Sequence, residues 1–456
     1  MPKKVLCINP PPGKTYGKTS RDGRCQSEEG TWTETFPPTT LAAIAGHIRS
    51  RGHSVELIDC IGSDITWEIL EDKMGRFMAD VVIINTITPT IGEDLQVARI
   101  AKNINPACVT AAYGTMPTAM PEQMRKLQPD LDFCLRGDPE TPALAAVEGG
   151  NVPSEIWVEP DLDDLAIPAY ELLPPSYRFP LNNKRWTFLI DGKGCPYRCT
   201  FCVEPIVSHR KARYKSIPRV MEEIEYIVRK LKFPFFMFWD ELFTLNIERS
   251  LEICKLMVER GLHKECQWML TTRVDKADEE LFKWMKKAGC WMMVFGIESG
   301  NQKVLDSVKK DITLEQSRQA VTTAKKYGLK TVGHFIIGLP GSSKETELDT
   351  IRFAKSLPLD FAQFYCCTAF PGSELYDWAL KEKLLAVNSW EGIEQGTANI
   401  GYKDFPASEI QKLRRRAYSE FYWRPIFWLR FFRIFSFTAL LQLIPRGLRF
   451  IKWMLK

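Results

Sequence analysis

The sequence predicts an α/β protein built from two successive αβ units and a helical carboxyl-terminal region. Short apolar strands alternate with helical patterns along residues 1–148 and again along 186–375. A proline-rich, acidic segment at 149–185 separates the two series and should be a linker that crosses a surface. A chain of 456 residues is long enough for two or three domains. We therefore expect domains at 1–148 and 186–375, followed by a helical region at 376–456.

The first unit has the pattern of a doubly wound parallel sheet. Its first helical segment carries Leu41, Ile44 and Ile48 at helical spacing. Because helices separate the strands, the strands should run parallel, with a ligand site at their carboxyl ends. The expected strands are 5–9, 55–59, 81–86, 108–113 and 133–136, and the expected helices are 39–51, 91–103 and 121–127.

The second unit repeats the alternation with six strands. This pattern suits either an incomplete barrel or another open sheet, and periodicity alone does not separate them. The expected strands are 186–190, 235–239, 267–270, 291–295, 331–337 and 361–366, and the expected helices are 219–231, 247–260, 279–288, 314–327 and 344–355.

Composition and charge exclude several classes of protein. The aromatic content of 11% excludes a disordered chain, and 13 cysteines in 456 residues are too sparse for a disulfide scaffold. No signal peptide pattern follows Met1, so we expect a cytoplasmic protein whose thiols are reduced. Residues 412–456 carry eleven Lys or Arg and one acid, whereas the rest carries 50 basic and 55 acidic residues. A mildly acidic body argues against nucleic acid as a partner.

Three cysteines, Cys195, Cys199 and Cys202, follow the first strand of the second unit. Their C-x3-C-x2-C spacing allows them to bind one soft metal centre. Three ligands would leave one iron of a four-iron cluster open, whereas a closed zinc site needs a fourth ligand, for which His209 is close in sequence. The position after a strand, where ligand-binding loops are found, favours the cluster.

This motif resembles that of the radical S-adenosylmethionine (SAM) superfamily, in which the open iron chelates SAM. Four further segments match the family in order, each after a successive strand: FWDELFT at 238–244, TTRVD at 271–275, FGIESG at 295–300 and GHFIIGLPG at 333–341. The resemblance covers about residues 186–370. It implies a partial (β/α)6 barrel, a [4Fe–4S] cluster held by the three cysteines, and SAM as a cofactor.

The resemblance also implies which residues contact SAM. The carboxylates after the second strand would lie near the methionyl amine, and the residues after the third and fourth near the carboxylate or ribose. The aromatic residue of the cysteine motif and the turn after the fifth strand would lie near the adenine. The acidic residues can also be explained as helix caps, and Arg273 as a partner of Asp275. The assigned residues are Phe201, Asp240, Glu241, Arg273, Glu298, Ser299, Gly338 and Pro340.

Residues 1–148 resemble the cobalamin-binding domain of B12-dependent radical SAM enzymes, which include methyltransferases, the anaerobic Mg-protoporphyrin ester cyclase and hopanoid- and lipid-modifying members. The matching segments are 9–11, 37–42, 51–53, 80–84 and 136–140. None of the five histidines lies in an Asp-x-His-x-x-Gly motif, so cobalamin should bind base-off without a protein imidazole. The turn at 113–117 departs from the family pattern, which leaves a degenerate domain without a corrin as the alternative. The implied cobalamin contacts are Asn9, Pro10, Thr86, Gly114, Gly137 and Glu140.

The carboxyl-terminal tail combines aromatic and basic residues. Nine aromatic residues lie within 421–437, interleaved with Arg424, Arg430 and Arg433. The longest uncharged stretch there is 12 residues, whereas a membrane span needs about 20. The tail is explained either by a helix lying on an anionic membrane surface or by a helix packing its aromatic side chains on the barrel.

These observations predict a cytoplasmic radical SAM enzyme, peripheral on the inner face of the membrane through its tail. It would cleave SAM reductively and functionalise an unactivated carbon of a hydrophobic substrate, with cobalamin-dependent C-methylation favoured. A flavodoxin or ferredoxin would supply electrons. One alternative is radical cyclisation or C–C bond formation on a lipid or tetrapyrrole without methyl transfer. Another, of a different class, is a zinc-holding, non-catalytic protein of the membrane surface.

Overall fold

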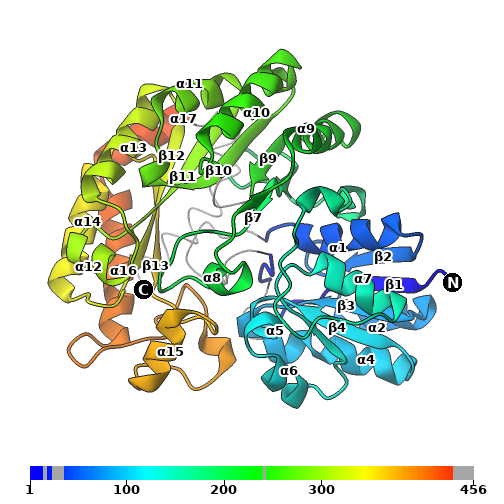
Figure 1. Cartoon of the computed structure of the whole chain (residues 1–456). Helices are drawn as coiled ribbons and strands as arrows, with labels where there is room; N and C mark the ends of the chain where they lie inside the picture. The colour runs from blue at the N-terminus through cyan, green and yellow to red at the C-terminus, as the bar shows by residue number, and fades with distance from the viewer. Residues whose placement is uncertain (14–17, 23–34, 240–242, 435–456) are drawn as a thin grey trace.

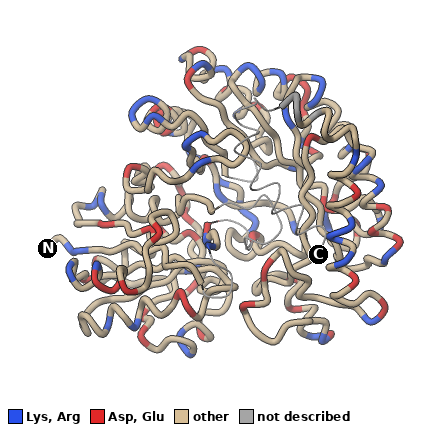
Figure 2. The backbone as a smooth tube through the Cα atoms, turned by 180° about the vertical axis from the view of Figure 1, so that it is seen from behind, with Lys and Arg blue, Asp and Glu red and all other residues tan. Residues whose placement is uncertain are grey.

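The computed structural model describes residues 1–13, 18–22, 35–239 and 243–434. Two αβ domains lie side by side, and the carboxyl-terminal helices pack against the second domain (Figure 1). Basic and acidic residues are interspersed along both domains in the described part of the chain (Figure 2).

The amino-terminal domain contains five parallel strands: β1 (Lys4–Asn9), β2 (Ser54–Asp59), β3 (Val81–Asn85), β4 (Val109–Tyr113) and β5 (Phe133–Leu135). Its helices are α1 (Thr39–Ser50), α2 (Trp67–Phe77), α3 (Ile91–Asp94), α4 (Gln96–Ile104), α5 (Thr115–Ala119), α6 (Pro121–Leu127) and α7 (Glu140–Glu148). The strand order is β2-β1-β3-β4-β5. Side chains of α1 and α7 pack on one face of the sheet, and those of α2, α4 and α6 pack on the other. The predicted doubly wound sheet is therefore confirmed.

The second domain is a six-stranded parallel sheet that curves into a partial barrel (Figure 1). Its strands, in the order β13-β12-β11-β10-β9-β6, are β6 (Trp186–Leu189), β9 (Phe235–Phe238), β10 (Gln267–Arg273), β11 (Cys290–Glu298), β12 (Lys330–Ile337) and β13 (Phe361–Cys366). The helices between them are α8 (Glu204–Val207), α9 (Ile217–Glu225), α10 (Ile247–Glu259), α11 (Glu279–Lys287), α12 (Gln302–Ser307), α13 (Leu314–Lys326) and α14 (Lys344–Ser356). The barrel expected from the resemblance is confirmed.

Helix caps fix where the strands of the barrel end and its helices begin. The side chain of Asp278 accepts a hydrogen bond from the backbone of Leu281 at the start of α11. Thr313 and Gln316 form a capping box at the start of α13. These caps satisfy backbone amides in the first turn of the outer helices. Because the strands run parallel, their carboxyl ends lie together at one mouth of the barrel.

The segment between the domains is packed rather than merely crossing a surface. Tyr170, Leu173 and Tyr177 are buried in the core of the barrel domain. The hydroxyl of Tyr177 donates to Asp59 of the first domain at 2.6 Å, and that of Tyr170 donates to Glu223 of the barrel at 2.5 Å. The segment thus joins the two domains through buried hydrogen bonds.

The carboxyl-terminal region contains α15 (Glu374–Lys381), α16 (Ala407–Tyr422) and α17 (Pro425–Ile434). Phe421, Tyr422, Phe427 and Phe431 are buried in the barrel core, so the packing interpretation of the tail holds for these four side chains. Residues 435–456 lie outside the described residues. Among the residues that are described, no helix is both long enough and apolar enough to cross a membrane.

Candidate active site

A cavity of about 570 Å³ lies inside the partial barrel and reaches the edge of the amino-terminal domain. Met269, Met292, Val332 and Phe361 from the barrel strands give it an apolar wall. All three cysteines of the motif line it, and so do residues of the first domain, among them Thr115 and Asp138. The barrel and the amino-terminal domain therefore share one cavity.

A short antiparallel hairpin, β7 (Gly192–Lys193) and β8 (Arg213–Tyr214), holds the cysteine loop. Gly194, between the hairpin and Cys195, has φ +89°, and a Cβ there would overlap the backbone oxygen of Lys211. The backbone amide of Cys195 donates to Ser208 at 3.4 Å. Glycine is therefore required for the loop to leave the hairpin at this point.

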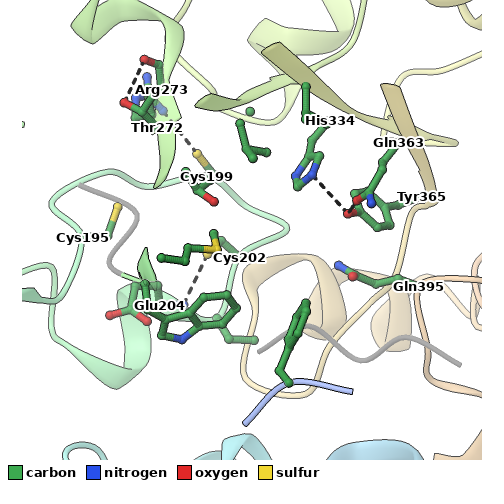
Figure 3. A pocket seen from close by; sticks show the side chains of 18 of the residues that line it. Cys195, Cys199, Cys202, Glu204, Thr272, Arg273, His334, Gln363, Tyr365 and Gln395 are labelled. Carbon is green, nitrogen blue, oxygen red and sulfur yellow. Dashed lines mark hydrogen bonds between the residues drawn. The ribbon is translucent and has the colours of Figure 1, made fainter. Parts of the chain in front are cut away.

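The three thiols lie around one end of the cavity (Figure 3). Cys199 is buried, and Cys195 and Cys202 are half-buried. The sulfur of Cys202 accepts a hydrogen bond from the backbone of Glu204 at 3.4 Å, and that of Cys199 accepts one from Arg273 at 3.9 Å. Hydrogen bonds of this kind stabilise a thiolate and a cluster bound to it.

The arrangement fits a cubane cluster better than a single zinc ion. No three His, Cys, Asp or Glu side chains among the described residues are grouped so that they could hold one metal ion. His209, the fourth ligand that a zinc site would need, is exposed. A cubane takes each thiolate through a separate iron, so its ligands need not converge on one point.

Arg273, at the end of β10, places a positive charge beside the cysteines. Its guanidinium lies 3.6 Å from the ring centroid of Tyr197 and donates to Asp275 at 2.8 Å and to the backbone oxygen of Lys310 at 2.7 Å. Burial alone would lower the pKa of Arg273, but the Asp275 carboxylate raises it. Arg273 pairs with Asp275 and also lines the cavity. The pairing with Asp275 therefore does not exclude a contact with SAM.

Glu298 enters the cavity at a bulge near the end of β11. The register with β12 shifts between Gly296 and Glu298, and Glu298 has φ +65°. A Cβ on Gly296 would lie 2.7 Å from a carboxylate oxygen of Glu298, so the glycine makes room for this carboxylate. Nζ of Lys310 donates to Oε1 at 2.7 Å, whereas the buried Oε2 has no hydrogen-bond partner among the described residues. An unpartnered buried oxygen suits a ligand that brings a donor.

Lys310 completes a buried set of charges around the cysteine loop. Burial alone would lower the pKa of Lys310, but the Glu298 carboxylate and then the Cys199 thiolate raise it. Its ammonium lies 6.0 Å from the ring centroid of Phe201, which also lines the cavity. One end of the cavity therefore carries both a carboxylate and two cations.

Three further residues expected to contact SAM, Ser299, Gly338 and Pro340, do not line the cavity. The hydroxyl of Ser299 lies 3.1 Å from that of Thr350 and is directed toward α14 rather than the cavity wall. Gly338 donates to Glu347 at 2.8 Å, and neither it nor Pro340 is among the residues lining the cavity. Asp240 and Glu241 lie outside the described residues.

At the carboxyl edge of the first sheet, the expected cobalamin contacts are held by protein hydrogen bonds. Asn9 donates to Asp59 at 2.7 Å, and Thr86 donates to the backbone oxygen of Tyr113 at 2.8 Å. The backbone oxygen of Pro10 accepts from Arg21 at 2.9 Å. Gly114 and Gly137 both have positive φ and lie against the backbone oxygens of Thr86 and Trp157, respectively.

The same edge also contains buried polar atoms that lack partners among the described residues. They include Oδ1 of Asn85, the hydroxyls of Tyr113 and Thr88, and Nε of Arg21. Leaving such groups unpaired costs about 1–3 kcal/mol each, so a ligand with amide or hydroxyl groups would be stabilised there. Cobalamin carries a periphery of amides, and these residues fit it.

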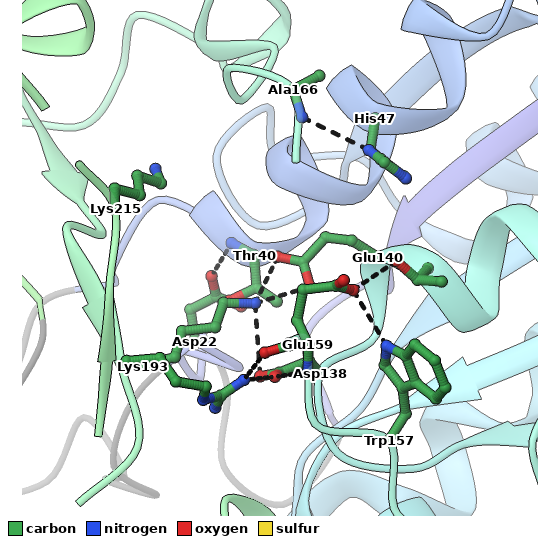
Figure 4. Close-up of polar contacts among 12 residues, drawn as sticks. Asp22, Thr40, His47, Asp138, Glu140, Trp157, Glu159, Ala166, Lys193 and Lys215 are labelled. Carbon is green, nitrogen blue, oxygen red and sulfur yellow. Dashed lines mark hydrogen bonds and ion pairs between the residues drawn. The ribbon is translucent and has the colours of Figure 1, made fainter. Parts of the chain in front are cut away.

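Glu140 lies at the joint between the domains (Figure 4). Both its oxygens accept from Nζ of Lys193 at 2.7 Å. Arg213, on the other strand of the hairpin, donates to Asp138 at 2.6 Å and to the backbone oxygen of Glu159 at 2.7 Å. Burial would raise the pKa of Asp138, but Lys193 and Arg213 lower it. The hairpin that precedes the cysteines is therefore fastened to the amino-terminal domain by charge.

Several residues at the site have no counterpart in the sequence predictions. Lys310 follows a helix and matches no motif, and its pairing with Glu298 depends on the fold. Lys193 is two positions before Cys195, which is the only local signal for it. His334 was part of a quoted segment, and its alternation with Val332 and Ile336 would have placed it on their face of the strand.

Two family models match the chain, a B12-binding domain over residues 30–147 and the radical SAM superfamily over residues 189–354. The chain belongs to the radical SAM enzymes that carry an amino-terminal B12-binding domain. The two matches imply a [4Fe–4S] cluster, SAM and cobalamin as its cofactors.

Among the relatives, an uncharacterized methyltransferase of Pyrococcus horikoshii is 33% identical over 417 residues, covering 86% of this chain and 89% of the relative. The anaerobic magnesium-protoporphyrin IX monomethyl ester cyclase of Rubrivivax gelatinosus is 29% identical over 374 residues, covering 76% of this chain and 66% of the relative. A solved structure of the methyltransferase TsrM from Kitasatospora setae, with cobalamin and a [4Fe–4S] cluster bound, matches the fold with a TM-score of 0.66 at 16% identity. That match covers 85% of this chain and 80% of TsrM.

Proposed function

We propose that this enzyme transfers a methyl group from SAM to an unactivated carbon of an apolar substrate, with cobalamin as the methyl carrier. One observation carries the proposal: the cysteine loop and the edge of the B12-binding domain line the same cavity. The two cofactor sites and the substrate can then meet without solvent between them. The uncharacterized methyltransferase of Pyrococcus horikoshii supports the reaction class.

In this proposal Cys195, Cys199 and Cys202 hold the cluster, and the charges beside them orient SAM. Oε2 of Glu298 would accept a hydrogen bond from a ribose hydroxyl or from the amino group of SAM, while Lys310 pairs with Oε1. Arg273 offsets negative charge at the cluster through its contact with Cys199. When bound, the cluster and SAM supply the radical chemistry and cobalamin supplies the methyl transfer.

Cobalamin would lie on the first domain at Gly114 and Gly137, facing the barrel, without a histidine ligand. Both histidines of that domain already accept hydrogen bonds from backbone amides. His47 accepts from Ala166 at 3.4 Å and His53 accepts from Lys3 at 3.1 Å. These bonds support the base-off mode inferred from the sequence.

The apolar wall of the cavity supports a hydrophobic substrate. Trp239 and Phe36 at one end and Met269 and Phe361 in the lumen would bury apolar surface at about 25 cal/mol per Å². The same wall excludes water from the reacting carbon. An electron donor such as a flavodoxin or ferredoxin, in the cytoplasm, completes the proposed system.

The described end of the tail supports peripheral contact with a membrane. Trp423, Ile426 and Leu429 are 49%, 45% and 60% exposed, whereas Phe427 and Phe431 on the same segment are buried. Three exposed apolar side chains near Arg424 suit the interface of an anionic bilayer.

The test is a product assay on anaerobically purified full-length protein with cluster, cobalamin, SAM and a reductant. Release of S-adenosylhomocysteine, the form of SAM that has given up its methyl group, should require bound cobalamin. Formation of 5′-deoxyadenosine should require the cluster. If 5′-deoxyadenosine forms without S-adenosylhomocysteine, radical cyclisation replaces methylation as the favoured reaction. If neither forms, the proposed function is wrong.

A further inference from the structure

A group of polar side chains interrupts the apolar wall of the cavity on β12 and β13. Strand alternation directs Val332, His334 and Ile336 of β12 into the cavity, and Phe361, Gln363 and Tyr365 of β13 beside them. His334 pairs in register with Gln363, and Ile336 with Tyr365. Three of these six strand positions, His334, Gln363 and Tyr365, are thus occupied by polar side chains, and the other three are apolar.

These polar side chains form one hydrogen-bonded cluster. Nε2 of His334 lies 3.4 Å from the hydroxyl of Tyr365, and this hydroxyl donates to Oε1 of Gln363. The His334 and Tyr365 rings meet edge to face, with centroids 5.2 Å apart. Gln395, from the carboxyl-terminal region, also lines the cavity, so a fourth polar side chain comes from outside the barrel.

The cluster lies across the cavity from the cysteine loop (Figure 3). The positions in register with His334 are Gly296 of β11 and, one strand further, Arg273 of β10, whereas the inward positions nearer the base of the barrel include Met269, Met292 and Val294. Apolar side chains thus line the deeper wall, and placing an imidazole, a phenol and an amide beside them costs desolvation. Nothing in the cofactor chemistry assigned to the cysteine end accounts for polar groups on this wall.

We propose that His334, Tyr365, Gln363 and Gln395 form a substrate subsite that holds one hydroxyl, carbonyl or amide group of an otherwise apolar molecule. Imidazole and amide side chains supply both donors and acceptors, so the subsite can recognise such a group by hydrogen bonds and fix its position. A molecule anchored there presents its apolar body to the lumen and one of its carbons to the cysteine end. This assignment rests on the proposed function and narrows its substrate class to amphipathic molecules with a single polar anchor.

The experiment compares two probes that differ by one hydroxyl, naphthalene and 2-naphthol. Their affinities for the anaerobically purified, cluster-containing full-length protein are measured by equilibrium dialysis. 2-Naphthol should bind about tenfold more tightly, because a subsite built to hydrogen-bond a polar group discriminates against the analogue that lacks it. In H334L and Y365F this preference should fall to about twofold or less, with naphthalene affinity little changed.

M292L serves as the matched control, because it changes the apolar wall alone and should alter both affinities by the same factor. Iron content and circular dichroism of each variant show that it has folded with its cluster. Equal affinity for the two probes in the natural protein overturns the subsite, as does a hydroxyl preference that survives in an H334L/Q363L double variant. Failure of both probes to bind also overturns it. None of these results depends on SAM cleavage, so the subsite and the proposed function fail separately.

Discussion

The two domains offer their ligands different kinds of unsatisfied polar group at the carboxyl ends of parallel strands. On the cavity wall of the barrel, a carboxylate oxygen of Glu298 has no hydrogen-bond partner among the described residues and lies near Arg273 and Lys310. In the amino-terminal domain, Arg21 pairs with Asp94 at 2.6 Å, and the buried atoms without a described partner include the neutral Oδ1 of Asn85 and hydroxyl of Tyr113, together with Nε of Arg21. Ionised groups suit the zwitterion of SAM, and neutral groups suit the amides of a corrin. Similar sheet edges thus become two chemically distinct sites.

The largest effect should follow from removing the cluster ligands. Replacing Cys195, Cys199 or Cys202 by Ala should abolish 5′-deoxyadenosine formation, because the cluster loses a thiolate that no neighbouring described residue replaces. C290A, a buried cysteine of the barrel, is the control and should keep its iron. Iron analysis and product chromatography measure both. All four variants should keep their affinity for cobalamin. A loss of cobalamin together with the cluster would show that the two cofactor sites depend on each other.

The second-largest effect should follow from breaking the Lys193–Glu140 ion pair at the joint between the domains. K193M would leave Glu140 buried without its partner, which costs about 3–5 kcal/mol, whereas K193M/E140Q should recover much of that loss. Thermal unfolding and cobalamin retention measure the effect. K309M, which removes the exposed Lys309–Glu374 pair, should cost less than about 1 kcal/mol. If K193M retained both stability and cobalamin, the charged joint would be incidental to the shared cavity.

A pair of variants separates the two edges directly. E298Q should weaken SAM binding about tenfold, because the amide presents a weaker acceptor and leaves Lys310 unpaired. Y113F should weaken cobalamin binding by a similar factor and raise the stability of the cobalamin-free protein, because it removes an unpartnered buried hydroxyl. Isothermal titration with each cofactor gives both values. If each variant impaired both cofactors equally, the comparison between the edges would fail.

Much of this fold was predictable from the sequence. Apolar alternation located most strands closely, and β13 coincides with the expected 361–366. Helix α2 was missed because its exposed face is rich in charge and only Leu70 and Met74 are buried. The hairpin of β7 and β8 has two residues per strand, too few to produce a periodic pattern.

The site was predictable only where a motif carries it. The cysteines, Arg273, Glu298 and Phe201, all of which belong to the family motifs, line the cavity. Ser299, beside Glu298, turns toward α14 because successive side chains of a strand point to opposite faces, and Glu298 already faces the cavity. Lys193 and Lys310 reach the site through pairings with Glu140, 53 positions away, and Glu298, 12 positions away. Such contacts depend on the fold, and no sequence motif announces the pairing itself.

Each domain also buries carboxyl groups whose pKa is raised, and one group from each domain sharpens the comparison through pH. Burial raises the pKa of Asp22 to about 6 and that of Glu347 to about 7. At a pH between the pKa of the unfolded state and the pKa of the folded state, each carboxyl group is protonated in the folded protein and ionised in the unfolded chain. Stability therefore falls as pH rises through these windows, by up to about 1.4 kcal/mol per pH unit for each group.

E347Q should remove the part of this fall between about pH 4.5 and 7, and D22N the part between about 3.8 and 6. Urea denaturation across about pH 3.8 to 8 measures both slopes. Because Glu347 accepts from Gly338 in the barrel, its slope should persist without cobalamin, whereas that of Asp22 should respond to cobalamin at the edge it supports. An unchanged slope in E347Q would show that this carboxyl is ionised in the folded protein.

The smallest effect on the enzyme itself should come from shortening the tail. Because Phe427 and Phe431 are part of the barrel core, removal of residues 435–456 is a cleaner test of membrane contact than removal from residue 421. The removed segment carries Arg446, Arg449, Lys452 and Lys456, each worth about 1 kcal/mol at most near an anionic surface. Cosedimentation with phosphatidylserine vesicles should therefore weaken, most clearly at low salt, while iron content and 5′-deoxyadenosine formation persist.

W423S/L429S, which changes the exposed apolar face of the described helices, should remove the part of binding that survives high salt. If neither change weakened vesicle binding, or if the full-length protein did not bind vesicles at all, the proposed membrane contact of the tail would be wrong.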